Sequence, residues 1–175
     1  MQVIDWQIII KEHGPVVWNT AYRLLGNSAD AADCFQETFI CALKVCESQK
    51  VRNFSALLTR LATTRAIDQL RRRFRSEQNN LILDEGYVVS SDSDPAKCAQ
   101  QQELAVRLQK ALAQLPLQEA QVFCLRYLND MSYRKIAKEL NIKTNAVGVL
   151  LHRAKEKLRK SFSPLSNQQK SEVVL

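Results

Sequence analysis

Glycine and proline are scarce in this sequence, with only four of each among 175 residues. Because these residues interrupt helices and build the turns between strands, their scarcity argues against a turn-rich β-protein. Leu, Ala, Gln, Lys and Arg are abundant, and hydrophobic residues make up 46% of the chain, enough to bury a core. The composition therefore predicts an all-α protein with one ordinary domain or two small ones.

Residues for metal or disulfide chemistry are also few. The five cysteines are odd in number and form no Cys-x-x-Cys pair, and neither His13 nor His152 has a Cys or His neighbour at ligand spacing. A zinc site is therefore not expected, and the cysteines are interpreted as reduced, mostly buried thiols of a cytoplasmic protein. We expect no metal and no cofactor.

Membrane-inserting and catalytic patterns are missing as well. No apolar run approaches the ~18 residues of a membrane span, and the start, Met1–Asp5, lacks the basic region of a signal peptide. There is no Gly-rich phosphate loop, and neither histidine has a convincing nucleophile partner in the sequence. We expect no membrane insertion, no catalytic residues and no small-molecule substrate.

The chain has a net charge of +7 and a pI of about 9.3, which suits a polyanion such as nucleic acid or an anionic membrane surface. Eight basic residues lie in Lys50–Arg75 and nine in Arg134–Lys160. Between these blocks lie the acidic residues Asp84, Glu85, Asp92 and Asp94. This distribution predicts two nucleic-acid surfaces joined by a connector.

Hydrophobic periodicity predicts four helices in a first domain over residues 1–78. We expect a short helix over Val3–His13, broken at Gly14-Pro15, and a second helix after that break. The third is expected to be capped by Ser28, and the fourth to start at Asn53 or Ser55.

The helical period is lost over Ser76–Pro95, and a flexible acidic linker is predicted over residues 79–98. A second domain of four helices is expected over residues 99–163, followed by a polar tail over 164–175. The fold class predicted is thus all-α, with two small helical domains joined by the linker.

The strongest local pattern is a helix-turn-helix over Ser132–Lys160. Ser132 and Thr144 are suited to cap its two helices, and Asn141 suits the left-handed position between them. The second helix of such a motif lies in the major groove of DNA. The alternative is an ordinary helical hairpin with a solvated basic face.

Two further segments carry charge on one face. Arg71-Arg72-Arg73-Phe74-Arg75 places four arginines in five residues, which can neutralise several phosphates, or can simply be a solvated helix end. Asp30–Phe39 turns apolar residues inward and carboxylates outward, which suggests a protein partner with basic groups, or again a solvated face.

The acidic segment resembles the polymerase-binding helix of extracytoplasmic-function (ECF) sigma factors, a group of the sigma-70 family, whose pattern is close to Asp-Ala-Glu-Asp-x-x-Gln-Glu-Thr-Phe. Ala32 stands where the pattern has its first Glu. The matching residues are Asp30, Asp33, Gln36, Glu37, Thr38 and Phe39.

The arginine segment is similar to the family's next motif, Trp-Leu-Tyr-Arg-Ile-Ala-Arg-Asn-x-x-Ile-Asp-x-Leu-Arg-Arg. It matches through Leu58-Thr59-Arg60-Leu61-Ala62 and Ala66-Ile67-Asp68-Gln69-Leu70-Arg71-Arg72, whereas Leu57 and Thr64 replace the family's Trp and Asn. Further matches follow in order, so that the resemblance covers residues 5–162: Leu115-Pro116, Ser132-Tyr133, Ile136-Ala137, Leu140 and Leu151-His152-Arg153-Ala154.

The resemblance implies a sigma factor that carries core RNA polymerase to promoter DNA, with an anti-sigma factor as a common partner. Implied polymerase contacts are Asp30, Asp33, Gln36 and Glu37. Implied contacts to the upstream-ten element, together with a loop near Ser76–Asn80, are Arg60, Arg65, Gln69, Arg71, Arg72, Arg73 and Arg75. Implied contacts to the upstream-thirty-five element are Lys143, Thr144, Asn145, Gly148, His152, Arg153 and Lys155.

One departure from the family lies in the DNA-reading helix. Gly148-Val149-Leu150 stands where the family often has Lys, Ser and Arg, so these positions cannot make bidentate contacts to bases. One hypothesis is that Gly148 lets the helix backbone approach DNA closely, with readout from Asn145, Arg153 and DNA shape. The alternative is that the three residues pack inward.

Two other functions remain open from the residues alone. A stand-alone helix-turn-helix regulator explains residues 99–162 equally well but does not explain the acidic and arginine helices that precede them. A nucleic-acid enzyme lacks both a phosphate loop and a metal cluster in the sequence.

Overall fold

The computed structural model describes residues 4–79 and 95–163, and all regular structure in these ranges is helical. The elements are α1 (Trp6–Leu25), α2 (Ser28–Ser48), α3 (Phe54–Asn79), α4 (Pro95–Gln114), α5 (Leu117–Tyr127), α6 (Tyr133–Leu140) and α7 (Thr144–Phe162). The predicted all-α class is confirmed. The central part of the expected linker, residues 80–94, and the expected tail, 164–175, lie outside the described residues.

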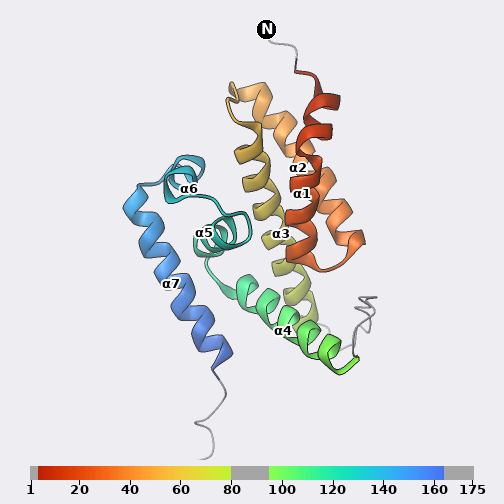
Figure 1. Cartoon of the computed structure of the whole chain (residues 1–175), viewed down its shortest axis with the longest axis vertical. Coiled ribbons are helices and arrows are strands. Elements are labelled where there is room, and N and C mark those ends of the chain that lie inside the picture. The colour runs from red at the N-terminus through yellow and green to blue at the C-terminus, as the bar shows by residue number, and fades with distance from the viewer. Residues whose placement is uncertain (1–3, 80–94, 164–175) are drawn as a thin grey trace, which may run out of the picture.

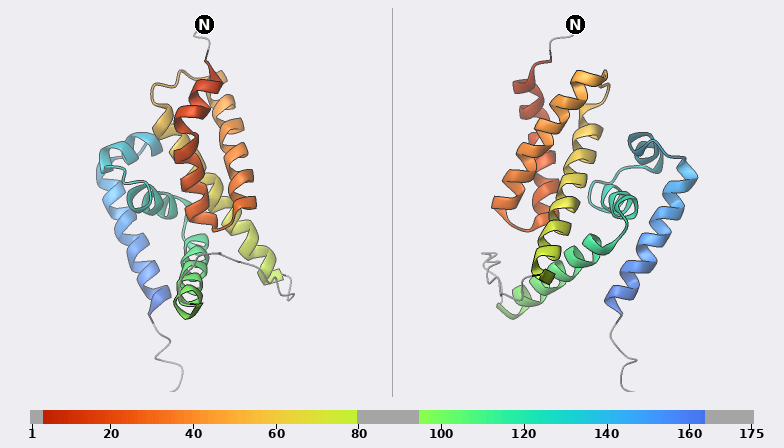
Figure 2. Two further views of the ribbon diagram at one scale, coloured as in Figure 1. Left: turned by 45° about the vertical axis from the view of Figure 1, so that its right-hand side comes forward. Right: turned by 180° about the vertical axis from the view of Figure 1, so that it is seen from behind.

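Helix α3 is the centre of the molecule. It packs against α1 and α2 on one side and against α4 and α5 on the other, while α7 lies at the outer edge against α5 (Figures 1 and 2). Helices α1–α3, here called the first half, and α4–α7, the second half, therefore meet along α3.

Helix α1 runs straight through the predicted break at Gly14-Pro15, so that expectation is wrong. The buried face continues across the proline, from Ile9 to Val17. Pro15 itself is exposed, so water can satisfy the carbonyl that loses its hydrogen bond. Packing of one continuous apolar face thus overrides the local preference of proline.

Helix boundaries in the first half follow capping chemistry. Of the two predicted starts of α3, Asn53 and Ser55, Asn53 is the cap: its Oδ1 accepts a hydrogen bond from the amide of Ala56 at 3.0 Å. Helix α2 is capped by Asn27, one residue before the predicted cap Ser28. The Oδ1 of Asn27 accepts a hydrogen bond from the amide of Asp30 at 2.8 Å.

Two other predicted boundaries are wrong. The segment near Ser76, expected as a loop, is helical, since α3 continues to Asn79. Pro95 and the three residues after it, expected within the linker, form the first turn of α4. Proline is favourable there because the first helical amide has no intrahelical acceptor to lose.

One hydrophobic cluster spans both halves of the molecule. From α3 it contains Ile67 and Leu70, and from α4 it contains Leu112, all of them at most 2% exposed. Further members come from α1, α2, α5 and α7: Leu24, Leu25, Ala31, Cys34, Cys124 and Leu158. Because these residues exclude water jointly, the halves are expected to stabilise each other.

Two cysteines are buried in this shared cluster, and burial changes their chemistry. Desolvation raises the pKa of the Cys124 thiol to about 12 and that of Cys34 to about 11, against an unperturbed 9.0. Because the thiolate is the reactive form, we expect iodoacetamide at pH 8 to modify Cys124 and Cys34 only after unfolding. The half-buried Cys41 and Cys46 are expected to react first. Mass spectrometry of peptides from protein labelled with and without urea measures the order of labelling. Equal labelling rates of Cys124 in urea and in buffer would contradict the prediction.

Candidate polymerase and nucleic-acid interfaces

The outer face of α2 carries the predicted polymerase contacts. Asp33, Gln36 and Glu37 are all exposed, as their place outside the apolar stripe predicts. Asp30 differs, because its carboxylate accepts a hydrogen bond from Asn27 at 2.8 Å and lies 3.6 Å from the guanidinium of Arg73. Asp30 therefore holds the start of α2 to the end of α3, whereas the other three side chains face solvent.

An aromatic pair on α1 adjoins this face and was missed by the sequence reasoning. Trp18 stacks on Tyr22, with ring centroids 6.5 Å apart, and also contacts Phe35 of α2. Trp18 is 36% exposed and Tyr22 42% exposed. Large aromatic rings beside an exposed polar face are typical of protein interfaces, and their position off the buried stripe of α1 was the available signal.

The predicted DNA-binding arginines of α3 fall into two groups. Arg72 and Arg75 are exposed. Arg60, Arg65, Arg71 and Arg73 are half-buried, as is Gln69. Arg65 donates to the sulfur of Cys41 on α2 at 3.0 Å, within the first half. The structure thus does not bring the whole set onto one open surface.

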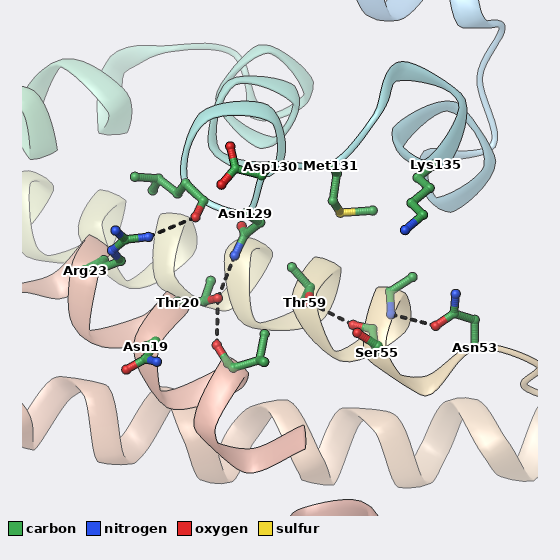
Figure 3. Close-up of a pocket in the computed structure, with 13 residues that line it drawn as sticks. Asn19, Thr20, Arg23, Asn53, Ser55, Thr59, Asn129, Asp130, Met131 and Lys135 are labelled. Carbon is green, nitrogen blue, oxygen red and sulfur yellow. Dashed lines mark hydrogen bonds between the residues drawn. The ribbon is translucent and has the colours of Figure 1, made fainter. Parts of the chain in front are cut away.

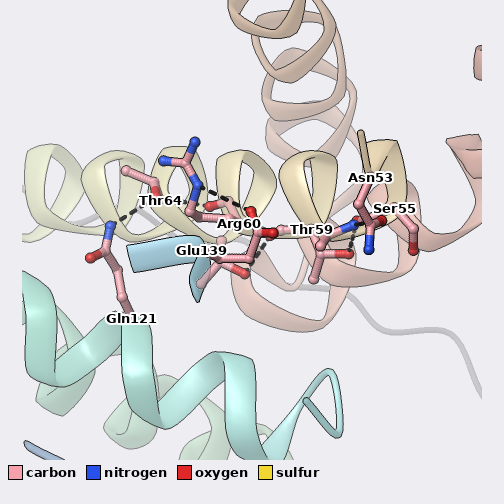
Figure 4. Close-up of polar contacts among 9 residues, drawn as sticks. Asn53, Ser55, Thr59, Arg60, Thr64, Gln121 and Glu139 are labelled. Atoms are coloured by element: carbon pink, nitrogen blue, oxygen red, sulfur yellow. Dashed lines mark hydrogen bonds and ion pairs between the residues drawn. The ribbon is translucent and has the colours of Figure 1, made fainter. Parts of the chain in front are cut away.

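Three of the half-buried arginines contact the second half. The Nε of Arg60 lies 3.9 Å from the carboxylate of Glu139 on α6 (Figure 4). Arg71 donates to the carbonyl of Leu115, and Arg73 donates to the Gln109 side chain at 2.8 Å. In this arrangement these guanidinium groups bind the chain itself rather than facing solvent.

The halves also satisfy the unpaired carbonyl groups at each other's helix ends. The last four carbonyls of a helix have no partner within it. Gln109 of α4 donates to the carbonyl of Leu24 at the end of α1, at 2.9 Å. Arg23 of α1 donates to the carbonyl of Leu128, just after α5, at 3.0 Å. Positive or donor side chains at these ends are favoured further by the helix dipole.

Neutral hydrogen bonds complete the contact. Gln121 of α5 donates to the hydroxyl of Thr64 at 2.9 Å, at the position where the resembling family has Asn (Figure 4). Asn129 donates to the hydroxyl of Thr20 at 2.8 Å, on the wall of a polar cleft between the halves (Figure 3). The halves are therefore joined by specific polar contacts as well as by a shared core.

The helix-turn-helix is formed by α6 and α7. The hydroxyl of Ser132 caps α6, and Asn141 is left-handed, with a φ of 52°, as predicted. The prediction that Thr144 caps α7 is wrong. The capping position is Lys143, whose side chain makes no capping hydrogen bond. Ile136 and Val147 are fully buried where the two helices cross.

The outward face of α7 displays most of the predicted base and phosphate contacts. Those that are exposed are Lys143, Thr144, Asn145, His152, Arg153 and Lys155. Gly148 is half-buried, and an added Cβ would meet only the Tyr133 ring, at 3.9 Å. Val149 is 51% exposed, while Leu150 packs against the core of the helix-turn-helix. The alternative that these residues pack inward is therefore correct for Leu150 and wrong for Val149.

An ion pair between a buried glutamate and a half-exposed lysine anchors α7 to α5. Glu119 is 5% exposed, and its carboxylate lies 2.8 Å from the Nζ of Lys157. Lys157 is thus engaged within the second half, and so is Lys155, whose Nζ lies 5.1 Å from the centre of the Tyr127 ring of α5. Arg153 remains exposed on α7.

No cluster of three potential metal ligands occurs among residues 4–79 and 95–163. None of the helices in those ranges is long and apolar enough to cross a membrane.

Comparison with known proteins explains this pairing of halves. The family model for sigma-70 region 2 matches residues 9–76, and the model for sigma-70 region 4 matches residues 105–158. The ECF RNA polymerase sigma factor SigW of Bacillus subtilis is 32% identical over 161 residues, which cover 85% of this chain and 84% of SigW. The chain belongs to the ECF sigma factors.

The ECF sigma factor SigE of Mycolicibacterium smegmatis is 31% identical over 164 residues. That match covers 94% of this chain, and the chain spans 64% of the length of SigE. Sigma factors are specificity subunits of RNA polymerase without catalytic activity, so membership also decides against the nucleic-acid enzyme. The family predicted from the motifs is confirmed.

A solved structure shares the fold. The sigma factor RpoE, in a co-crystal structure with the anti-sigma factor NepR from Bartonella quintana, superposes with a TM-score of 0.55. The match covers 90% of this chain and 96% of that one, at 19% sequence identity. At this identity the likeness establishes the fold of this ECF sigma factor and nothing further.

Proposed function

We propose that this ECF sigma factor binds core RNA polymerase, directs it to particular promoters and helps open the DNA there, in the cytoplasm. The observation that carries the proposal is the union, in one chain, of a region 2 match on α1–α3 and a region 4 match on α4–α7. A stand-alone regulator would need only the second.

The exposed face of α2 is proposed as the polymerase contact. Asp33, Gln36 and Glu37 present acceptors that suit basic groups of a protein partner. The neighbouring Trp18 and Tyr22 provide the rigid apolar area on which interface energy usually depends.

DNA contacts are proposed on two surfaces. Arg72 and Arg75 near the end of α3 suit phosphates next to the upstream-ten element. The exposed side of α7, with Asn145 and Arg153, suits the major groove of the upstream-thirty-five element. The half-buried arginines Arg60, Arg71 and Arg73 join the first surface once the halves part.

Parting of the halves follows from distances on DNA. The positions that name the two elements, ten and thirty-five base pairs upstream, are about 25 base pairs apart, or about 85 Å at ~3.4 Å per base pair. In the described arrangement, α3 and the second half are in direct contact, for example through Thr64 and Gln121 at 2.9 Å. This closed arrangement suits the chain before it joins polymerase, and an anti-sigma factor is proposed as a partner that binds it in a non-transcribing state.

Holoenzyme formation tests the proposal. The double variant Asp33→Ala/Gln36→Ala is expected to bind core polymerase about tenfold or more weakly, because both side chains would be lost from an interface without disturbing the core. A pull-down titration with native core enzyme measures the affinity, and run-off transcription on a genomic library identifies the promoters.

The matched control is Gln100→Ala/Glu103→Ala, since these residues are also exposed but lie on α4. It is expected to bind core enzyme as the unaltered chain does. Failure of the unaltered chain to form a holoenzyme at low salt, with no inhibitor present, would refute the proposed function and leave the stand-alone regulator.

A further inference from the structure

Val149 is an exposed apolar side chain between two exposed polar side chains of α7. It is 51% exposed on α7, and it lies one helical turn from Asn145 on one side and one turn from Arg153 on the other, both exposed. The next residue, Leu150, points into the core of the helix-turn-helix, so the orientation of α7 is fixed and Val149 faces outward.

The surface beside Val149 is also open. Gly148 precedes it, and even an added Cβ there would find only the Tyr133 ring, at 3.9 Å. The missing side chain at Gly148, with polar side chains one turn away on either side of Val149, would let a base edge reach the valine methyl groups. Val149 is, moreover, the sixth residue of α7, in the N-terminal part of the helix that meets base edges in helix-turn-helix proteins.

The chemistry of the major groove limits what a valine can read. A valine side chain cannot form hydrogen bonds with the donors and acceptors on base edges, whereas it can make apolar contacts with the C5-methyl group of thymine. We propose that Val149 contacts a thymine methyl group in the upstream-thirty-five element and thereby sets the base preference at that position. This inference rests on the proposed function, because it needs α7 in the major groove.

Replacing thymine by uracil tests the contact, since uracil keeps the hydrogen-bonding pattern and lacks only the methyl group. The holoenzyme is titrated with promoter duplexes in which each thymine of the upstream element is replaced in turn. At one position uracil is expected to weaken binding about fourfold, the usual effect of one buried methyl group. The variant Val149→Ala is expected to bind the thymine and uracil duplexes equally well.

A control variant sharpens the result. Val106→Ala removes the same atoms from a 37% exposed valine on α4 and is expected to keep the fourfold sensitivity to uracil.

Three outcomes would overturn the inference: an upstream element without thymine, indifference of the unaltered holoenzyme to uracil at every position, or persistence of the sensitivity in Val149→Ala. Each of these requires a holoenzyme that forms and initiates transcription. Failure to form one would instead refute the proposed function, so the two are distinguishable.

Discussion

Replacing Gln109 by Ala is expected to weaken the contact between the two halves by about 2–4 kcal/mol. Gln109 is 7% exposed, and its amide makes two hydrogen bonds across the contact. It donates to the carbonyl of Leu24 at 2.9 Å and accepts from Arg73 at 2.8 Å. Truncation leaves the carbonyl of Leu24, at the end of α1, without this donor. It also removes one acceptor from the guanidinium of Arg73. Loss of a buried hydrogen bond, or of one to a charged group, lowers stability more than loss of a bond between exposed groups.

Urea unfolding and small-angle X-ray scattering of the free chain measure this effect. A lower unfolding midpoint and a larger radius of gyration than in the unaltered chain are expected. The control is Lys110→Ala, the exposed neighbour on the same helix, which should change neither. If both variants behave alike, the closed contact does not hold in solution.

The same variant should affect DNA binding by the free chain. Arg73 is held by Gln109, Asp30 and Leu25 in the closed arrangement. Release from Gln109 exposes more of the arginine surface of α3, so Gln109→Ala is expected to bind promoter DNA more tightly than the unaltered chain when polymerase is absent. With polymerase bound, the halves have already parted and the difference should disappear.

Replacing Ile67 by Ala is expected to destabilise the protein by about 2–5 kcal/mol, the usual range for such truncations in a core. Ile67 is fully buried in the cluster that joins α3 to α4 and α5. The cavity therefore opens between the halves and removes contacts from both. For a chain of this size the melting temperature is expected to fall by roughly 5–20 °C.

The shape of the transition is informative as well. Because the cluster includes residues of both halves, calorimetry is expected to record one cooperative transition that shifts as a whole. Ile40→Ala is the matched control, since Ile40 is 51% exposed on α2 and its loss should change stability by no more than about 0.5 kcal/mol. Two separate transitions, of which only one moves, would contradict a shared core.

Sequence patterns were sufficient wherever a local rule governs the backbone. Ser132 and Asn141 were placed correctly, and the cap of α3 was narrowed to Asn53 or Ser55, because capping and the left-handed turn depend on neighbouring amides alone. The helical period likewise placed Asp33 and Glu37 on an exposed face. Order and spacing of motifs then identified the family, which the comparisons confirm.

Local rules failed where packing over long distances competes with them. Pro15 predicts a break, yet the apolar face of α1 is buried on both sides of it and the helix continues. Val149 and Leu150 are both apolar neighbours, and only the orientation of α7 against α5 and α6 turns one outward and the other inward.

The sequence by itself determined the all-α class, the motifs of an ECF sigma factor and the charge on each helix face. Only the tertiary structure decided which charges face solvent, since Arg72 is exposed while Arg71 and Arg73 contact the second half. Periodicity orients a side chain about its own helix axis. It does not specify which face of another helix, some 40 residues away along the chain, will lie against it.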